Sequence, residues 1–173
     1  GASAYLGCGN DKFSMTNALR YKTTAYLLGS LDTEGEYEPS DFDYQTYLSW
    51  SPSSHWSIDF IGNISRNNYD FTPSSRTTKF GTAEDLKEFK VYFDGMEKDE
   101  FHTYFGALSA THNFNKYNNL SFTYSAFDSR EKETFDISGE YWLNNDADNQ
   151  SLGIGKYMEH ARNNLKSSVH SIA

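Results

Sequence analysis

The feature that most constrains the fold is a strict alternation of apolar and polar side chains along long segments. In "FDYQTYLSW" (42–50) and "WSIDFIGNIS" (56–65), one set of alternate positions carries Phe, Tyr, Leu, Trp and Ile, and the other carries mainly polar residues. The segments 101–114 and 120–126 also show a period of two, although both faces of 101–114 are only partly apolar. A period of two is the signature of a β-strand with two chemically different faces. The sequence therefore predicts two antiparallel hairpins.

The length of these segments favours a membrane-crossing sheet over an ordinary one. They run for about 9–14 residues, whereas an ordinary strand has about 5–6 and a tilted transmembrane strand needs about 9–11. Trp50 and Trp56 flank the short turn "SPSSH", and Phe114 and Tyr117 lie at the short turn "NKYNN". Aromatic residues at strand ends are typical of the girdles of membrane barrels.

The connections are predicted to alternate in length, with long loops at about 70–88 and 128–156. Short turns at one end and long loops at the other are typical of outer-membrane barrels. We therefore predict an all-β fold, an antiparallel meander of about six long strands from a transmembrane β-barrel, with short periplasmic turns and long extracellular loops. Asp94-Gly95 predicts a tight turn, and Thr82 with Asp85 a cap on a short helical turn.

Some alternatives remain open at this point. A soluble β-sandwich or jelly roll can also turn an apolar face to a core, and a small eight-stranded barrel fits the length of 173 residues. At 156–170, Tyr157, Ala161, Leu165 and Val169 recur at helical spacing. Helix and strand are equally compatible with that last stretch.

Composition excludes several classes of function. The net charge of −9 argues against a nucleic-acid partner, because phosphate binding needs a basic surface. A single cysteine, Cys8, excludes an internal disulfide framework and a cysteine-based zinc site. No apolar run approaches 18 residues, so no transmembrane helix is predicted.

No catalytic or metal-binding pattern emerges from the sequence. The five histidines do not have metal-ligand spacing. Asp146, Asp148 and Gln150 resemble the start of a calcium loop, but Ser151 stands where that loop needs glycine. The carboxylates Asp94, Glu97, Asp99 and Glu100 are expected to be solvated loop charges rather than a glycosidase pair. We predict no enzyme activity, no cofactor and no metal.

Ligand binding, if present, is expected in the predicted long loops. Arg76, Tyr141 and Trp142 lie there, and an aromatic side chain in a loop can stack on a sugar ring or an apolar ligand. A soluble β-sandwich that binds carbohydrate through such aromatic side chains is the alternative function. Simple packing within the loops is the alternative role for these three residues.

Several stretches together resemble the barrel region of TonB-dependent outer-membrane receptors of the Bacteroidetes type. The resemblance runs from about Asn17 to Val169 and rests on "ALRYKTTAYLLGSLDTEGEYEPSDFDYQTYLSW", "WSIDFIGNISRNNYDFTPSSRTTKFGT", "FKVYFDGMEKDEFHTYFGALSA", "SAFDSREKETFDISGEYWLN" and "GIGKYMEHARNNL". It implies import of a nutrient of the glycan, siderophore or cobalamin class through a plugged barrel in the outer membrane. The implied partners are the TonB system, outer-membrane lipid and a surface substrate-binding lipoprotein.

The resemblance covers part of such a receptor. Plugged transporters have about 22 strands, so residues 1–173 are expected to be a partial barrel segment, without the plug domain, the TonB-contacting N-terminal part and the other strands. The polar residues Asp59, Asn63, Thr103 and Ser121 are expected to share one face and to line the lumen.

Overall fold

A computed structural model describes residues 1–24, 35–82, 85–145 and 151–173. In these residues the chain is almost entirely β-strand. The strands are β1 (Ala2–Gly9), β2 (Phe13–Thr23), β3 (Gly35–Ser53), β4 (Trp56–Pro73), β5 (Arg76–Thr82), β6 (Asp85–Asn113), β7 (Asn119–Asn145) and β8 (Ser151–Ile172). The prediction of an all-β fold of long strands is confirmed, and the count of about six strands is wrong.

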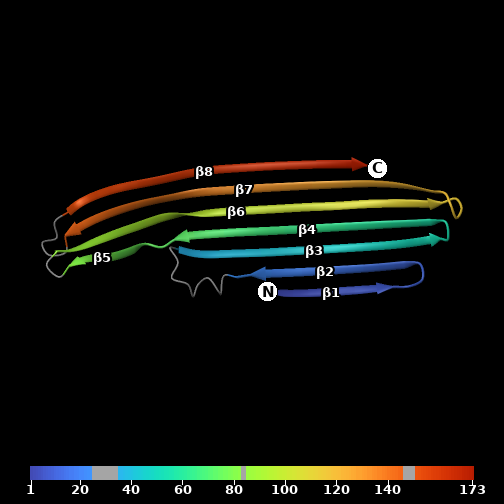
Figure 1. The fold of residues 1–173 in the computed structure, drawn as a ribbon, viewed down its shortest axis with the longest axis horizontal. Helices are drawn as coiled ribbons and strands as arrows, with labels where there is room; N and C mark the ends of the chain where they lie inside the picture. The colour runs from blue at the N-terminus through green and yellow to red at the C-terminus, as the bar shows by residue number, and fades with distance from the viewer. Residues whose placement is uncertain (25–34, 83–84, 146–150) are drawn as a thin grey trace.

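All eight strands belong to one antiparallel meander sheet. The order is β1-β2-β3-β4-β6-β7-β8, and β5 pairs with the part of β6 that β4 does not reach. Within the described residues the sheet is open: β1 pairs only with β2, and β8 only with β7. Figure 1 shows a single elongated layer with its short connections β1–β2, β3–β4 and β6–β7 at one end. The described residues therefore form neither a two-layer sandwich nor a closed barrel.

The register divides the side chains of the sheet into two faces. Leu48 lies opposite Phe60, Phe60 opposite Leu108, and Leu108 opposite Tyr124. Residues directly opposite one another in antiparallel strands point to the same face, so Leu48, Ile58 and Leu108 share one face, called the apolar face here. Asp59, Asn63, Thr103 and Ser121 lie on the other, the polar face, as predicted.

Almost nothing is buried in this single layer. Among the described residues, Ile137 is the buried hydrophobic side chain, at 5% exposure, and many large apolar side chains are exposed. A sheet gains most of its stability by covering at least one face. The exposed faces and the unpaired backbone groups of β1 and β8 are consequently surfaces that another layer, lipid or further strands would cover.

Several predicted loops are strands instead. The segments 70–88 and 128–156 contain the end of β4, all of β5, the start of β6, most of β7 and the start of β8, so the long loops predicted there are wrong for the described residues. Beyond the apolar segments the strands continue with charged side chains that pair across strands, as in the Lys132–Glu100 ion pair at 3.8 Å. Apolar and polar residues no longer alternate there, but the strands remain paired through their backbones.

Two smaller predictions are also wrong, and one that was left open is decided. Asp94 and Gly95 continue β6 opposite Ser138 and Ile137; Gly95 has a φ of 104°, which glycine accommodates without turning the chain. Thr82 pairs with Asp85 as the last pair of β5 and β6, rather than capping a helix. Residues 156–170, for which the sequence was compatible with either a helix or a strand, are part of β8.

Candidate functional surfaces

The apolar face carries a continuous apolar band next to the short turns. The band extends on β4 from Trp56 to Ile64, about 27 Å of strand length. Its large side chains are Phe13, Met15, Leu19, Tyr44, Leu48, Trp50, Trp56, Ile58, Phe60, Ile64, Tyr104, Leu108, Leu120, Phe122, Tyr124 and Ile172. Leu108 is 49% exposed and Phe122 is 56% exposed, so the band is uncovered.

Aromatic side chains lie at both ends of the apolar band. At the short turns, the rings of Trp56 and His112 are 4.5 Å apart, and His112 meets Phe114 edge to face at 4.6 Å. At the opposite end, Tyr104 is 43% exposed. Tyr44 also lies there, and its hydroxyl donates to Asn17 Oδ1 at 2.7 Å. The predicted aromatic residues at the turns are confirmed, and a second aromatic row bounds the band at its far end.

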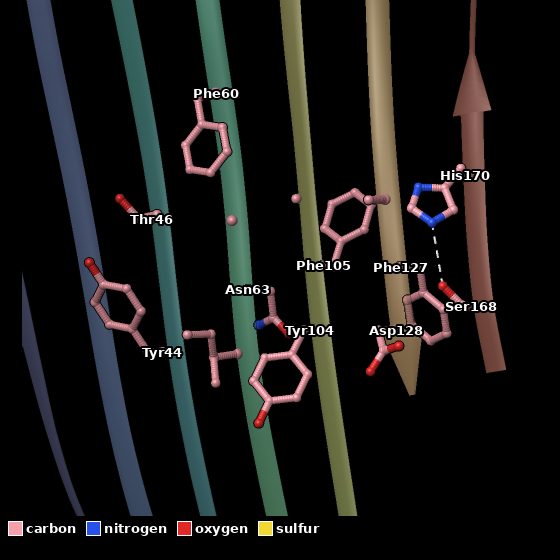
Figure 2. A pocket seen from close by; sticks show the side chains of 14 residues that line it. Tyr44, Thr46, Phe60, Asn63, Tyr104, Phe105, Phe127, Asp128, Ser168 and His170 are labelled. Atoms are coloured by element: carbon pink, nitrogen blue, oxygen red, sulfur yellow. Dashed lines mark hydrogen bonds between the residues drawn. The ribbon is translucent and has the colours of Figure 1, made fainter. Parts of the chain in front are cut away.

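A shallow groove of about 530 Å³ crosses the apolar band. Its floor is a row of small residues in register on four strands: Thr46, Gly62, Gly106 and Ala126. Tyr44 and Tyr104 line one side and Phe60 the other, as Figure 2 shows from close by, and Ile64 lies opposite both tyrosines in the same row. The groove forms because small side chains from four separate strands fall in one row between rows of large ones.

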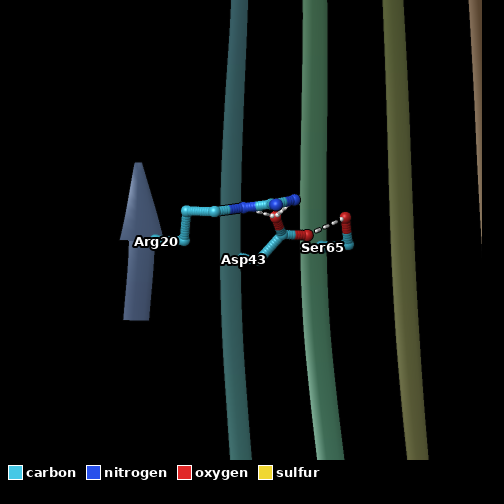
Figure 3. A network of polar contacts seen from close by, with 3 residues as sticks. All are labelled: Arg20, Asp43 and Ser65. Carbon is cyan, nitrogen blue, oxygen red and sulfur yellow. Dashed lines mark hydrogen bonds and ion pairs between the residues drawn. The ribbon is translucent and has the colours of Figure 1, made fainter. Parts of the chain in front are cut away.

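The polar face holds a hydrogen-bonded network across β2, β3 and β4. Arg20 Nε donates to Asp43 Oδ2 at 2.9 Å, and Ser65 Oγ donates to Asp43 Oδ1 at 2.9 Å (Figure 3). Both oxygens of the carboxylate are therefore paired by neighbouring strands. These charge-assisted bonds link side chains of three neighbouring strands on this face.

Further hydrogen bonds link polar-face side chains nearer the short turns. Tyr47 Oη donates to Asp59 Oδ1 at 2.8 Å, and Ser57 Oγ donates to Asp59 Oδ2 at 3.0 Å. On β6 and β7, the hydroxyls of Ser109 and Thr123 lie 2.9 Å apart. At the level of the apolar band, the opposite face thus combines hydrogen-bonded polar groups with the apolar side chains of Ile61, Phe105 and Phe127.

The three predicted ligand-binding residues lie on strands and do not converge. Arg76 is opposite Val91, which is opposite Tyr141, so Arg76 and Tyr141 share the polar face with one strand between them. Trp142 points to the other face, where its ring meets Tyr92 edge to face at 5.1 Å. The expectation that they lie in loops is wrong, and they do not form one three-residue cluster.

The predicted carboxylate group is split between the two faces. Glu97 and Asp99 lie on the polar face of β6, and Asp94 and Glu100 on the other. Burial raises the pKa of Asp99, and the nearby Glu133 raises it further; burial likewise raises the pKa of Glu97. The four carboxylates therefore do not converge as one group, and they lie on β6 rather than in the loop expected for them.

The described part of the chain contains no arrangement of side chains suited to binding a metal ion. No group of three or more His, Cys, Asp or Glu side chains there is arranged to hold an ion. Asp146, Asp148 and Gln150, the residues like a calcium loop, lie outside the described residues. Cys8 is a free, exposed thiol on the apolar face of β1.

Comparison of the chain with known protein families, curated protein sequences and solved structures found no match. In the described residues, no helix is long and apolar enough to cross a membrane. Functional inference therefore depends on the two faces of the sheet.

Sequence reasoning did not find the groove. The signal was available in part, because Thr46, Gly62, Gly106 and Ala126 interrupt four apolar series. Only the register of the strands shows that these interruptions coincide in one row.

Proposed function

We propose that this chain is part of the barrel wall of a TonB-dependent outer-membrane receptor that imports a nutrient of the glycan, siderophore or cobalamin class. The observation that carries the proposal is the apolar band, which is bounded by aromatic rows at both ends and backed by a hydrogen-bonded polar face. Transmembrane β-barrels have this arrangement because lipid contacts one face of each strand and the lumen the other.

The depth of the band agrees with a membrane crossing. From Trp56 to Ile64 the strand rises by about 27 Å, and strands tilted by about 40° would span about 21 Å of membrane thickness with it. The outward apolar band of outer-membrane barrels is about 25 Å tall. Strands of ordinary sheets have no reason to maintain an exposed band of this depth.

The open edges support a role as one section of a larger wall. Backbone groups at a sheet edge cannot remain unpaired in lipid, so β1 and β8 require further strands on both sides. The polar face would then line the lumen, where Arg20, Asp43 and Ser65 would meet water or a plug domain. The end that carries the short turns would be periplasmic.

The first test is the size and location of the native polypeptide. Fractionated cells are immunoblotted with an antibody raised against this chain. A band several times larger than 19.8 kDa in the outer-membrane fraction supports the proposal. A soluble band near 19.8 kDa overturns it, and would favour a soluble binding module.

Import is tested separately on cells that lack the gene. Uptake of labelled cobalamin, ferric siderophore and oligosaccharide is compared in the deletion strain, the parent strain and a strain without TonB. Loss of uptake of one class in both mutants supports the transport role. Unchanged uptake of all three classes in the deletion strain contradicts it.

A further inference from the structure

Basic residues form a row directly beyond the apolar band, on the same face. Arg66, His102, Arg130 and Lys166 lie opposite one another on β4, β6, β7 and β8. With strands about 4.8 Å apart, the row extends for about 15 Å. The adjoining row adds Lys132. These five residues are called the basic row here.

The basic row contrasts with the rest of this acidic chain. At the same level on the polar face of β4, β6, β7 and β8, the residues are Ser65, Thr103, Ser129, Ser167, Asn67, Phe101, Glu131 and Leu165. They include one carboxylate and no Lys or Arg. At this level, the Lys and Arg side chains of these four strands therefore lie on the face that carries the apolar band. This is notable in a chain with a net charge of −9.

Part of the positive charge is not neutralised by the protein. Arg130 Nε is 3.2 Å from Asp128 Oδ1, and Lys132 Nζ is 3.8 Å from Glu100 Oε2. Within the described residues, no carboxylate forms an ion pair with Arg66 or Lys166. Arg66 Nε donates to His102 Nε2 at 2.9 Å, and both Arg66 and Lys166 are exposed.

We propose that the apolar face binds an anionic membrane lipid, with its phosphate on Arg66, Arg130 and Lys166 and an acyl chain in the groove over Gly62 and Gly106. The proposal rests on the proposed function, in which this face meets lipid. Guanidinium groups match phosphate oxygens in geometry as well as charge. The occupant is a lipid phosphate rather than a soluble one because the cations adjoin an apolar surface.

The groove is placed for the chain of the same lipid. Four residues, about 13 Å along the strands, separate the row of Gly62 and Gly106 from the basic row. Between them lie Ile64, Tyr104 and Asp128, and the Tyr104 ring borders the groove. A lipid whose headgroup lies at the basic row would therefore extend its acyl chain into the groove.

The test uses the native membrane protein that contains this sheet, purified in detergent. Bound lipid is counted by native mass spectrometry after exposure to phosphatidate or phosphatidylcholine. The variant carries Arg66→Gln, Arg130→Gln and Lys166→Gln. Its matched control carries Lys12→Gln, Lys87→Gln and Lys116→Gln, the same charge change outside the basic row.

The wild type and the control are expected to retain phosphatidate in preference to phosphatidylcholine. Each cation near a membrane surface contributes about fivefold, so the triple variant is expected to lose on the order of a hundredfold of that preference. Equal retention of both lipids by the wild type would overturn the proposal. Equal loss in variant and control would also overturn it, by assigning the effect to net charge.

Two further experiments test the binding of the phosphate and of the acyl chain separately. Inorganic phosphate is expected to leave bound phosphatidate in place; displacement at matched concentration would indicate a soluble-anion site and overturn the proposal. Gly106→Leu fills the groove, where an added Cβ meets only ordinary contacts, 3.7 Å from Phe60 at the nearest. This variant is expected to retain less of both lipids while keeping the preference for phosphatidate. Undiminished retention would contradict the placement of the acyl chain in the groove.

Protein that folds and fractionates with the outer membrane but shows no lipid preference defeats this inference and leaves the proposed function standing. Protein that never enters the membrane fraction defeats both. If the triple variant fails to fold, Lys166→Gln alone, on the edge strand β8, is expected to lower the preference about fivefold. An unchanged preference in that variant would overturn the proposal.

Discussion

The ring of Tyr141 lies over Gly155, the residue opposite it on β8. A Cβ added to Gly155 would collide with Tyr141 ring atoms, so this strand pair accommodates the ring only because Gly155 has no side chain. Covering a strand glycine with a cross-strand aromatic restores some of the packing that the glycine lacks. The pair helps to attach the edge strand β8 to β7.

Gly155→Val is expected to destabilise the β7–β8 pair by about 1–3 kcal/mol, because the ring must leave its position. The control is Gly153→Val on the same strand, where nothing lies within 4 Å of an added Cβ. Urea unfolding of the native protein in detergent measures both. Equal destabilisation by the two variants would show that Tyr141 is not the cause.

Arginine at Leu108 is expected to cost about 2–4 kcal/mol if the apolar band faces lipid near the bilayer midplane. The matched control is Ser109→Arg, the next residue on β6, which lies on the polar face. Folding into lipid vesicles across a urea series gives both values. Leu48→Arg and Ile58→Arg are expected to behave as Leu108→Arg does, and equal tolerance on both faces would count against a membrane-facing band.

The Arg20–Asp43 pair is expected to couple β2 to β3 weakly. Arg20 remains 63% exposed, and exposed ion pairs contribute about 0.2–1 kcal/mol. A double-mutant cycle with Arg20→Gln and Asp43→Asn, measured by urea unfolding, is expected to give a coupling energy of about 0.5 kcal/mol. A coupling energy of zero would mean that the pair does not fix the register.

The carboxylates Glu97 and Asp99 are expected to make the outer part of β6 less stable as the pH rises. Burial raises the pKa of both groups above the ordinary value, and neighbouring carboxylates add to this effect. The folded sheet therefore favours their protonated forms. That contribution is fully present below the ordinary carboxyl pKa and is lost as the pH rises through the raised values.

Asp99→Asn tests this pH dependence. At about pH 7 the variant is expected to be more stable than the wild type by about 0.5 kcal/mol, and at about pH 4 the difference is expected to shrink. Asp11→Asn, in the turn between β1 and β2, is the control. Thermal unfolding at the two pH values measures the effect, and a difference that grows on acidification would contradict it.

Surface exposure on intact cells is expected at the end of the sheet opposite the short turns. An epitope inserted at Ser74, between β4 and β5, is expected to bind antibody on intact cells, whereas one at Ser54, between β3 and β4, is expected to bind only after permeabilisation. This tests the topology first assigned to the loops at 70–88 and the turn "SPSSH". The reverse pattern would invert the sheet in the membrane.

Strand character was readable wherever apolar and polar side chains alternated. Leu48, Ile58 and Leu108 were assigned to one face, and Asp59 and Thr103 to the other, from period alone. Where charges replaced that alternation, as at Lys98, Glu100 and Lys132, the sequence was read as loop. Backbone pairing does not require hydropathy to alternate, so β5 and the outer parts of β6 and β7 were missed.

The sequence by itself determined that this chain forms long two-faced strands with aromatic ends, because side-chain direction in a strand follows from residue parity alone. Tertiary structure decided which residues of different strands lie in one row. The groove over Gly62 and Gly106, and the row of Arg66, Arg130 and Lys166, exist only in the register between strands. That register is set by pairing between residues up to 58 positions apart, as for Lys87 and Asn145, which local patterns do not record.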